Sequence, residues 1–292
     1  MAVYTGVISR AKIKDYFEVL KPRETGLLTF IGVCAAILAG GGYPPVTPLL
    51  LVLVTIFVAS AGANGLTNYL DRDVDARMQR TRHRALPSKR IYPPEKVLPL
   101  TISLVVIGLA LAWWLHPLVF LFDLIGTTAA VVWRKRVTCV FPQGTVASCT
   151  PVLMGWLAIK PAFSWEILLL CVLIALWLPS HIWIVMVANR EDYLSAGIGY
   201  FPVNREVKTV VKIIFSFCLA LFGAAIGLYF AGNFGWLYLA VASVLSVTVI
   251  YTALRMMLSR MSKDSWRLYK LSAFPYLGLL FLAMCLDRWL LG

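Results

Sequence analysis

The sequence predicts an all-α membrane protein, a bundle of about nine transmembrane helices around a central cavity. Of the 292 residues, 60% are hydrophobic and 14% are charged, and the mean hydropathy is +0.80. A soluble domain carries about 25% charged residues. The apolar runs reach the length of roughly 20 residues that a helix needs to cross a bilayer. They are continuous rather than alternating, which argues against a transmembrane β-barrel.

Nine apolar runs follow one another, and we assign the whole chain, 1–292, to a single integral-membrane domain. The first 25 residues are polar and charged. We expect them to form an amphipathic lead-in on the cytoplasmic side, not a cleavable signal peptide. Glycine, proline and polar residues separate the runs and support their boundaries. The predicted helices are 26–42, 48–70, 97–115, 117–133, 144–160, 164–188, 209–231, 235–258 and 271–291.

The distribution of basic residues predicts the orientation of the bundle. Of the 27 lysines and arginines, 25 lie in or beside the N-terminal segment and the loops after the second, fourth, sixth and eighth runs. Basic residues accumulate on the cytoplasmic side. We therefore expect a multi-pass protein of the cell (plasma) membrane, N-terminus inside and C-terminus outside, whose active site opens to the cytoplasm. The same bias explains the net charge of +13 without a nucleic-acid partner.

The second apolar run ends in a stripe of side chains that carry oxygen. Four of them share one helical face, within roughly 60° of arc at about 100° per residue; they are Asn64, Asn68, Asp71 and Asp75. Asp73 falls on the opposite face. Carboxylate and carboxamide oxygens are ligands suited to Mg²⁺. A solvated helix end with ion pairs is the alternative, but this stripe begins inside an apolar segment, where polar side chains are costly and commonly functional.

A second polar cluster lies where the sixth apolar run ends. The run contains His181 and leads into Asn189–Tyr193. If this helix is unbroken, Asp192 lies on the same face as His181, with the imidazole about 16 Å deeper in the membrane. A structural role explains the histidine equally well. Two acidic clusters followed by basic residues suggest two related halves that face one cavity and hold a metal-bridged diphosphate.

The residues of both clusters resemble the motifs of a known family. The stretch Asn68–Asp75 is similar to the NxxDxxxD signature of the UbiA superfamily of intramembrane prenyltransferases. Its continuation, Met78–Arg82, resembles the protohaem IX farnesyltransferase (haem O synthase) branch. Other stretches that resemble this branch are Trp133–Thr138, Pro151–Trp156, His181–Trp183 and Arg190–Tyr193 with Gly197. The resemblance spans about residues 22–205.

The resemblance implies a magnesium-dependent enzyme that transfers a farnesyl group from farnesyl diphosphate to a vinyl group of haem B. Water addition then gives haem O, and pyrophosphate leaves. The implied catalytic and metal-binding residues are Asn68, Asp71, Asp75 and Asp192, with Asn64 in support. Besides the lipid bilayer, the implied partners are the two substrates and, as candidates, haem A synthase or the oxidase assembly.

The resemblance also implies a set of substrate-binding residues. Basic side chains would bind the phosphates or the haem propionates; they are Arg80, Arg82, Lys135 and Arg136. His181 would contact haem, either at the iron or near the reacting vinyl group, and Tyr193 would bind substrate. Positive-inside anchoring explains some of the basic residues equally well.

The sequence departs from the family pattern near the second cluster. Position 196 is alanine, where the wider superfamily often has a further aspartate, and Ser180 separates Pro179 from His181. Two alternative functions remain open. One is a prenyltransferase with another acceptor, such as an aromatic acid, a chlorophyllide or a glyceryl phosphate. The other is an ion- or proton-coupled transporter, which would need its charges near the bilayer midplane, whereas these lie at helix ends.

Overall fold

The computed structural model describes residues 12–132, 143–258 and 262–291. Within these ranges the chain forms α-helices and one short 3-10 helix, and no strand occurs. The all-α prediction is confirmed. The helices are α1 (Ile13–Val19), α2 (Pro22–Ala39), α3 (Val46–Arg77), η1 (Pro94–Val97), α4 (Leu98–Leu115), α5 (Pro117–Val132), α6 (Gln143–Ile159), α7 (Trp165–Ala188), α8 (Arg190–Ser195), α9 (Val207–Ala231), α10 (Trp236–Leu258), α11 (Ser262–Ser272) and α12 (Phe274–Leu291).

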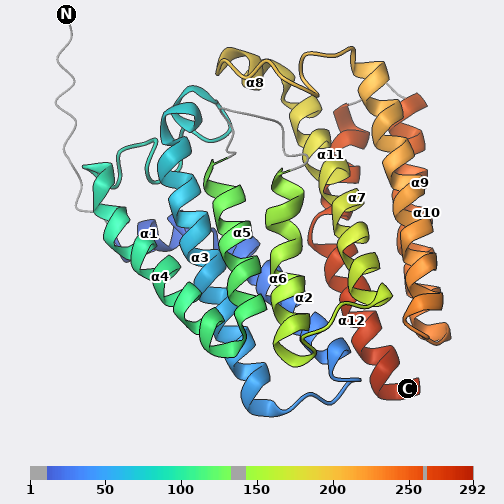
Figure 1. Ribbon diagram of the computed structural model, residues 1–292. Helices are drawn as coiled ribbons and strands as arrows, with labels where there is room; N and C mark the ends of the chain where they lie inside the picture. The colour runs from blue at the N-terminus through green and yellow to red at the C-terminus, as the bar shows by residue number, and fades with distance from the viewer. Residues whose placement is uncertain (1–11, 133–142, 259–261, 292) are drawn as a thin grey trace, which may run out of the picture.

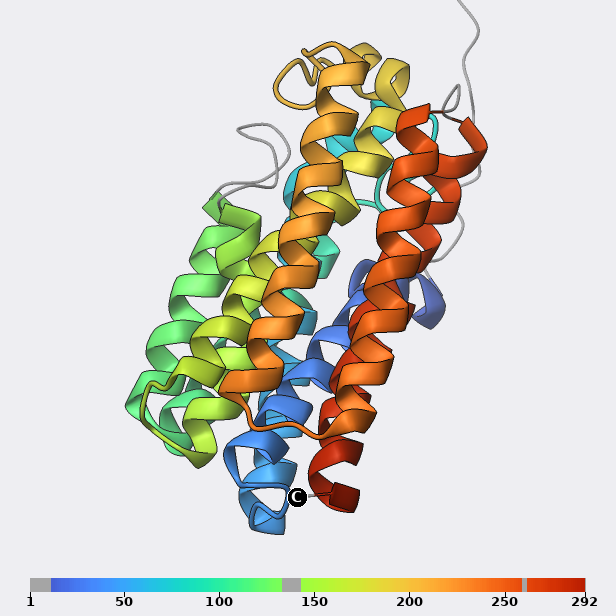
Figure 2. The same ribbon diagram turned by 90° about the vertical axis from the view of Figure 1, so that its right-hand side faces the viewer.

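Helices that are long and apolar enough to cross a bilayer dominate the fold. Seven segments of the described chain meet this requirement: α2, α3, η1 with α4, α7, α9, α10, and Ser265–Leu290. Helices α5 and α6 are apolar but shorter. The membrane-bundle prediction is confirmed at this level, while a crossing by nine helices and the sidedness of the termini stay predictions. In Figures 1 and 2, α8 and the loop after α3 lie at one end of the bundle, opposite the α2–α3 loop and the C-terminus.

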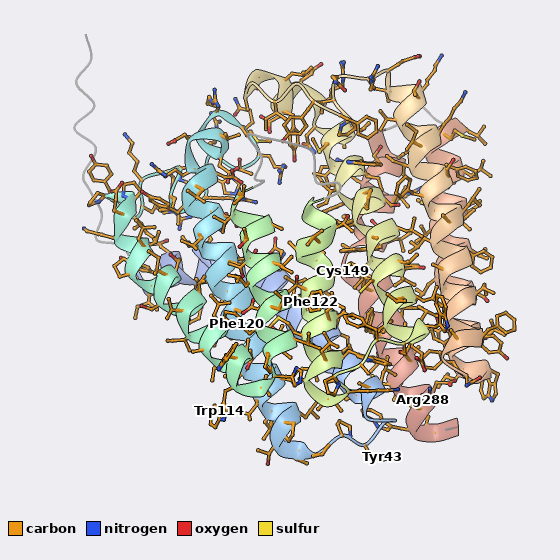
Figure 3. The ribbon with its side chains drawn as sticks, in the orientation of Figure 1. Tyr43, Trp114, Phe120, Phe122, Cys149 and Arg288 are labelled. Carbon is orange, nitrogen blue, oxygen red and sulfur yellow. The ribbon has the colours of Figure 1, made fainter. Side chains whose placement is uncertain are left out.

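The bundle end opposite α8 carries aromatic side chains suited to a membrane interface. Figure 3 shows Tyr43 and Trp114 at this end, together with Arg288. Tyr43 and Trp114 are 76% and 74% exposed. Tryptophan and tyrosine are enriched at the depth of lipid headgroups. Arg288 is held inward, because its guanidinium donates to the Gly232 carbonyl and lies over the Phe234 ring.

Glycines allow α2 and α6 to pack with their backbones in contact. A Cβ atom on Gly155 would lie 1.9 Å from the Gly32 carbonyl oxygen, so a larger residue does not fit. A Cβ atom on Gly32 would in turn lie 2.6 Å from the Pro151 carbonyl oxygen. Close backbone approach of this kind is common between membrane helices, where lipid offers no hydrophobic drive for association. The contact fixes α2, and therefore its starting residue Pro22, against the main core.

A small apolar cluster lies apart from the main core, beside the C-terminal end of α3. Val19 of α1 packs there with residues of the segment that follows α3, namely Ala85, Leu86, Ile91 and Val97. Asn68 of α3 donates a 2.6 Å hydrogen bond to the Val19 carbonyl, which places α1 against the end of α3. We call α1 together with residues 78–97 the cap. Hydrophobic contact within the cap ties the N-terminal helix to the loop after α3.

Candidate functional site

The predicted stripe lies on one unbroken helix. Helix α3 continues to Arg77, past the end of its apolar part. Asp71 and Asp75 are buried, with 8% and 1% of their surfaces exposed. The Asp73 side chain is 61% exposed, and its Oδ1 lies 3.7 Å from Nε of Arg72. The predicted separation of Asp73 from the two buried carboxylates is therefore present.

The two asparagines of the stripe connect α3 to the first two helices. The side-chain amide of Asn64 donates to Thr25 Oγ1 on α2 at 3.0 Å. The Asn68 amide donates to the Val19 carbonyl at the end of α1 at 2.6 Å. Each asparagine uses Nδ2 for this contact, so its Oδ1 atom is the group that is suited to a cation. Both residues therefore join α3 to its neighbours through the amide nitrogen and also carry an oxygen of the kind that cations bind.

Asp75 is paired with an arginine that the sequence analysis did not select. Nη1 of Arg84 lies 3.0 Å from Asp75 Oδ2. The loop between them turns back toward α3, and the Thr81 hydroxyl donates to the Asp75 carbonyl at 3.0 Å. The available signal was the alternation of arginines in 80–84, because it places several cations directly after the carboxylates. Spacing alone did not distinguish Arg84 from Arg82, which is exposed.

The loop after α3 and the loop after α7 meet, as the two-cluster prediction requires. Asp192 accepts a 2.6 Å hydrogen bond from the Gln79 backbone N–H and a 3.2 Å bond from that of Arg80. The Arg80 guanidinium donates to the Tyr193 hydroxyl at 3.2 Å. Burial raises the pKa of Tyr193, and the nearby Arg80 charge opposes this rise. The neutral phenol therefore persists at physiological pH.

Asp192 ties the second polar cluster to the loop after α3. Each of its carboxylate oxygens already accepts a backbone N–H group from the loop after α3. These bonds give Asp192 a role in holding the loop that carries Arg80, and its predicted part in metal binding stays a prediction.

His181 and Asp192 do not lie on one unbroken helix. Helix α7 ends at Ala188, Asn189 has φ −120° and ψ 32°, and a separate helix, α8, begins at Arg190. The stripe that joined His181 to Asp192 required an unbroken helix, so that prediction is wrong. His181 instead contacts α11, where its Nδ1 atom lies 3.1 Å from the Ser272 hydroxyl oxygen.

A cavity of about 590 Å³ opens beside the C-terminal end of α3. Asn68 and Asp75 line it, as do Arg84 and the start of α2. Other lining groups are the basic side chains of Lys14, Lys21 and Arg23 and the acidic side chains of Glu18 and Glu24. The sequence analysis treated this segment as an amphipathic lead-in and did not select its three cations. The signal for two of them was the Lys-Pro-Arg triplet of residues 21–23, shortly before the first apolar run.

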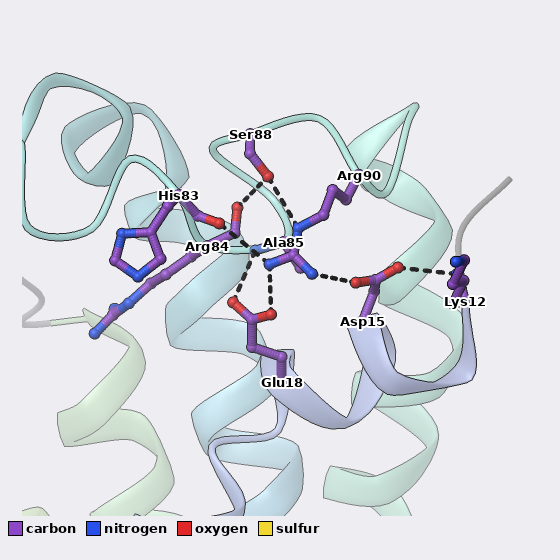
Figure 4. A network of polar contacts seen from close by, with 8 residues as sticks. All are labelled: Lys12, Asp15, Glu18, His83, Arg84, Ala85, Ser88 and Arg90. Atoms are coloured by element: carbon purple, nitrogen blue, oxygen red, sulfur yellow. Dashed lines mark hydrogen bonds and ion pairs between the residues drawn. The ribbon is translucent and has the colours of Figure 1, made fainter. Parts of the chain in front are cut away.

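An ionic network holds the cap over one side of this cavity (Figure 4). The Arg90 guanidinium bonds to both Asp15 and Glu18 of α1. Glu18 also accepts a 3.0 Å hydrogen bond from the Ala85 backbone N–H. The Lys12 backbone N–H, at 2.9 Å, and then the Arg90 charge hold the pKa of Asp15 below its usual range. Charge therefore reinforces the apolar attachment of α1 to the loop.

The oxygen donors at the end of α3 fit Mg²⁺ better than a softer metal. Among the described residues, no three histidine, cysteine, aspartate or glutamate side chains converge on one point. A set of two carboxylates and one amide oxygen, from Asp71, Asp75 and Asn68, suits an ion that keeps several of its own waters and also binds phosphate oxygens. Lys135 and Arg136 lie outside the described residues.

Comparison with known proteins identifies the family. Residues 27–282 match the UbiA prenyltransferase family. The chain belongs to this family. Protoheme IX farnesyltransferase of Desulforudis audaxviator is 35% identical over 288 residues, which cover 96% of this chain and 90% of that protein. The protein of the same name from Gloeobacter violaceus is 36% identical over 286 residues, 95% of this chain and 92% of that one. The resemblance predicted from the motifs is confirmed.

Solved structures support the same fold. The structure of a digeranylgeranylglyceryl phosphate synthase aligns with a TM-score of 0.77 at 15% identity, covering 94% of this chain and 98% of that one. A UbiA homolog from Archaeoglobus fulgidus, bound to GPP and Mg²⁺, aligns with a TM-score of 0.64 at 16% identity, covering 92% and 99%. These TM-scores establish a UbiA-type helix arrangement for this chain.

Proposed function

We propose that this protein transfers a farnesyl group from farnesyl diphosphate to a vinyl group of haem B, producing haem O and pyrophosphate. The observation that carries the proposal is the similarity, over at least nine-tenths of both chains, to two relatives named protoheme IX farnesyltransferase. The cavity beside Asn68 and Asp75 adds chemical support, because it combines oxygen ligands with several cations. A prenyl diphosphate and its metal require this combination.

The proposed reaction begins with departure of the diphosphate. The bond between farnesyl C1 and the diphosphate oxygen breaks, and its electron pair leaves with pyrophosphate. Asn68, Asp71 and Asp75 are the residues proposed to hold Mg²⁺. When bound, Mg²⁺ supplies positive charge that stabilises the leaving phosphates. Arg84 lines the cavity and is placed to release Asp75 and pair with phosphate oxygens instead.

Other residues act at the edges of the proposed diphosphate site. Arg80 is presented by a loop that Asp192 and Tyr193 hold in place. Arg82, Lys135 and Arg136 stay candidates for the phosphates or the haem propionates. Asn64 supports the stripe through its bond to α2. The apolar helices around the site exclude water from the allylic cation until it meets its acceptor.

The second half of the proposed reaction takes place on the porphyrin side chain. The terminal vinyl carbon of haem B bonds to farnesyl C1, which leaves a cation on the neighbouring carbon. Water adds there and loses a proton, which gives the hydroxyl group of haem O. His181 is proposed to bind the haem iron, because its ring is rigidly held and no described residue bonds to its Nε2 atom.

Mass spectrometry of haems tests this function. The protein is produced alone in cells that lack haem O, and the same assay is run in isolated membranes with Mg²⁺, haem B and geranyl, farnesyl or geranylgeranyl diphosphate. The expected product has the mass of haem B plus a hydroxylated farnesyl chain, with release of pyrophosphate. Unchanged haem B together with a prenylated aromatic acid or glyceryl phosphate would assign a different acceptor and overturn the proposal.

The proposed reaction also has a proposed location. The basic-residue bias supports a plasma-membrane enzyme whose site opens to the cytoplasm. Ser88 is exposed in the cap, and Tyr43 is exposed at the opposite end of the bundle. A cysteine at position 88 should react with an impermeant reagent only in inverted vesicles, and one at position 43 only in intact cells.

Co-purification tests the proposed association with haem A synthase or the oxidase assembly.

A further inference from the structure

His181 is enclosed by a cage of side chains from α7 and α11. Its imidazole is stacked between the Trp177 ring, at 5.0 Å and 8°, and the Tyr269 ring, at 4.7 Å and 16°. Its Nδ1 atom lies 3.1 Å from the hydroxyl oxygen of Ser272. Trp177 also donates its indole N–H to the Ser272 carbonyl. Both faces and one edge of the imidazole are therefore occupied.

The hydrogen bonds around Ser272 determine where the imidazole proton lies. A serine hydroxyl has one hydrogen to donate. The Ser272 hydroxyl is 3.2 Å from the Tyr269 carbonyl oxygen, which only accepts. If the hydroxyl hydrogen points to Tyr269, the Ser272 oxygen must accept from His181. Only this arrangement places a hydrogen atom both between Ser272 and the Tyr269 carbonyl and between His181 and Ser272. It puts the imidazole proton on Nδ1.

We infer that Ser272 is a positioning residue that fixes His181 in the Nδ1–H tautomer and so presents the Nε2 lone pair to the iron of haem B. The inference rests on the proposed function for its substrate. A neutral imidazole has one protonated and one unprotonated nitrogen, and a ligand to iron must use the unprotonated one. A hydrogen bond from the opposite ring nitrogen sets the ring orientation and raises the basicity of such a ligand.

The cage fixes the orientation of the His181 ring and shields its hydrogen bond from water. The stacked rings of Trp177 and Tyr269 prevent rotation of the imidazole about its side-chain bonds. Ser272 is 2% exposed, so water does not compete for its hydroxyl. A histidine that served only to join α7 to α11 would need the Ser272 contact but not a defined, unprotonated Nε2. The two roles therefore differ in the electronic state of the ring, which spectroscopy measures.

Resonance Raman spectroscopy of the ferrous haem complex tests the inference. The full-length protein in lipid nanodiscs is loaded with haem B alone, without prenyl diphosphate, and the iron–histidine stretching band is recorded. The wild type should show the band, and His181→Gln should lose it. Ser272→Ala should shift the band to lower frequency, because a ligand without its hydrogen-bond acceptor is less basic, and should weaken haem binding about tenfold. Ser272→Thr, which keeps the hydroxyl, should restore both.

Each outcome decides the question. Ser216→Ala is the matched control, because that serine is exposed and bonds only to its own helix; its band should equal the wild type. A wild type without the band, or a Ser272→Ala band at the wild-type frequency, overturns the inference. If Ser272→Ala does not fold, Ser272→Cys replaces it, and its weaker acceptor should give a smaller downward shift. Haem O formation is measured separately, so an inactive protein that shows these shifts refutes the proposed function alone.

Discussion

Two aspartates at the same end of the bundle have different kinds of partner. Asp75, on α3, is paired with the side chain of Arg84 at 3.0 Å. Asp192, on α8, accepts backbone N–H groups from Gln79 and Arg80 at 2.6 and 3.2 Å. An arginine side chain has several rotatable bonds and can move to another anion. Backbone donors move only if their loop unfolds. The pairing of Asp75 can therefore be exchanged for another contact, whereas the contacts of Asp192 hold the loop after α3 in place.

The comparison divides the polar residues into two functional groups. Asp71 and Asp75, with Asn68, form the group proposed to bind metal and diphosphate. Asp192 and Tyr193 belong to the group that holds Arg80 in place. Variants of the first group should change catalysis and metal dependence, whereas variants of the second should change substrate affinity. The predictions below test this division, in order of decreasing effect.

Loss of either buried carboxylate of α3 should have the largest effect. Asp75→Ala or Asp71→Ala should reduce turnover by at least about 10³-fold, because the charge that stabilises the leaving diphosphate is lost with its metal ligand. Product formation by mass spectrometry is the measurement. Size-exclusion elution in detergent should match the wild type. Folded variants that make haem O at the wild-type rate would remove these residues from the metal site.

Asp192→Asn should have an intermediate effect that separates the two groups. The amide keeps one acceptor oxygen but loses the charge that both backbone N–H groups bind. Hydrogen bonds to charged groups contribute about 1.5–3 kcal/mol, so the KM for farnesyl diphosphate should rise about tenfold as Arg80 loses its position. The Mg²⁺ concentration for half-maximal activity should stay unchanged. Steady-state kinetics over a range of Mg²⁺ concentrations measures both quantities.

Glu191→Gln is the matched control for this variant. It makes the same carboxylate-to-amide change at the exposed neighbouring position, and its KM should equal the wild type. A large rise in the Mg²⁺ requirement of Asp192→Asn would show that Asp192 binds the metal, and not only the loop that carries Arg80. The comparison between Asp75 and Asp192 would then fail.

Much of this arrangement follows from short-range sequence patterns. The apolar runs predicted the helices, because a spanning segment must satisfy its backbone hydrogen bonds internally. The helical wheel separated Asp73 from Asp71 and Asp75, because α3 continues without a break to Arg77. The contact between the loops after α3 and α7 was also predicted from two polar clusters at helix ends.

The remaining features depend on contacts between distant segments. The wheel from His181 to Asp192 failed because α7 ends at Ala188 and the chain changes direction there. The role of Arg84 depends on the return of its loop to Asp75, and Ser272 lies 91 positions from its histidine partner. Lys21 and Arg23 line the cavity at the start of α2, where Thr25 bonds to Asn64 of α3. No local periodicity encodes these contacts.

Arg90→Gln should produce a smaller effect, confined to the cap. The side chain joins α1 to the loop after α3 through Asp15 and Glu18. Ion pairs of this exposure contribute about 1 kcal/mol or less. Hydrogen exchange of the α1 amides should therefore accelerate about fivefold. Turnover at saturating substrate should stay unchanged. Lys96→Gln, an exposed change in the same segment, should leave the exchange rates as they are.

Acidification should loosen the same contact in the wild type. The pKa of Asp15 is held below its usual range in the folded cap. Its contribution is therefore fully present above the usual aspartate pKa of about 3.9 and is lost as the pH falls through the lower folded value. In Arg90→Gln this contribution should be smaller, and its loss should be complete at a higher pH. An identical pH profile for α1 exchange in both proteins would show that Arg90 does not stabilise the charged Asp15.

Asp73→Asn should have the smallest effect and sets the baseline for the division. Asp73 lies only two positions from both Asp71 and Asp75, yet its side chain is 61% exposed and faces away from them. Its pair with Arg72, at 3.7 Å, is a surface pair worth about 0–1 kcal/mol. Turnover, the KM for farnesyl diphosphate and the Mg²⁺ requirement should each change less than about twofold. A loss comparable to that of Asp75→Ala would show that negative charge anywhere at this helix end is sufficient, and the distinction by partner and burial would have no basis.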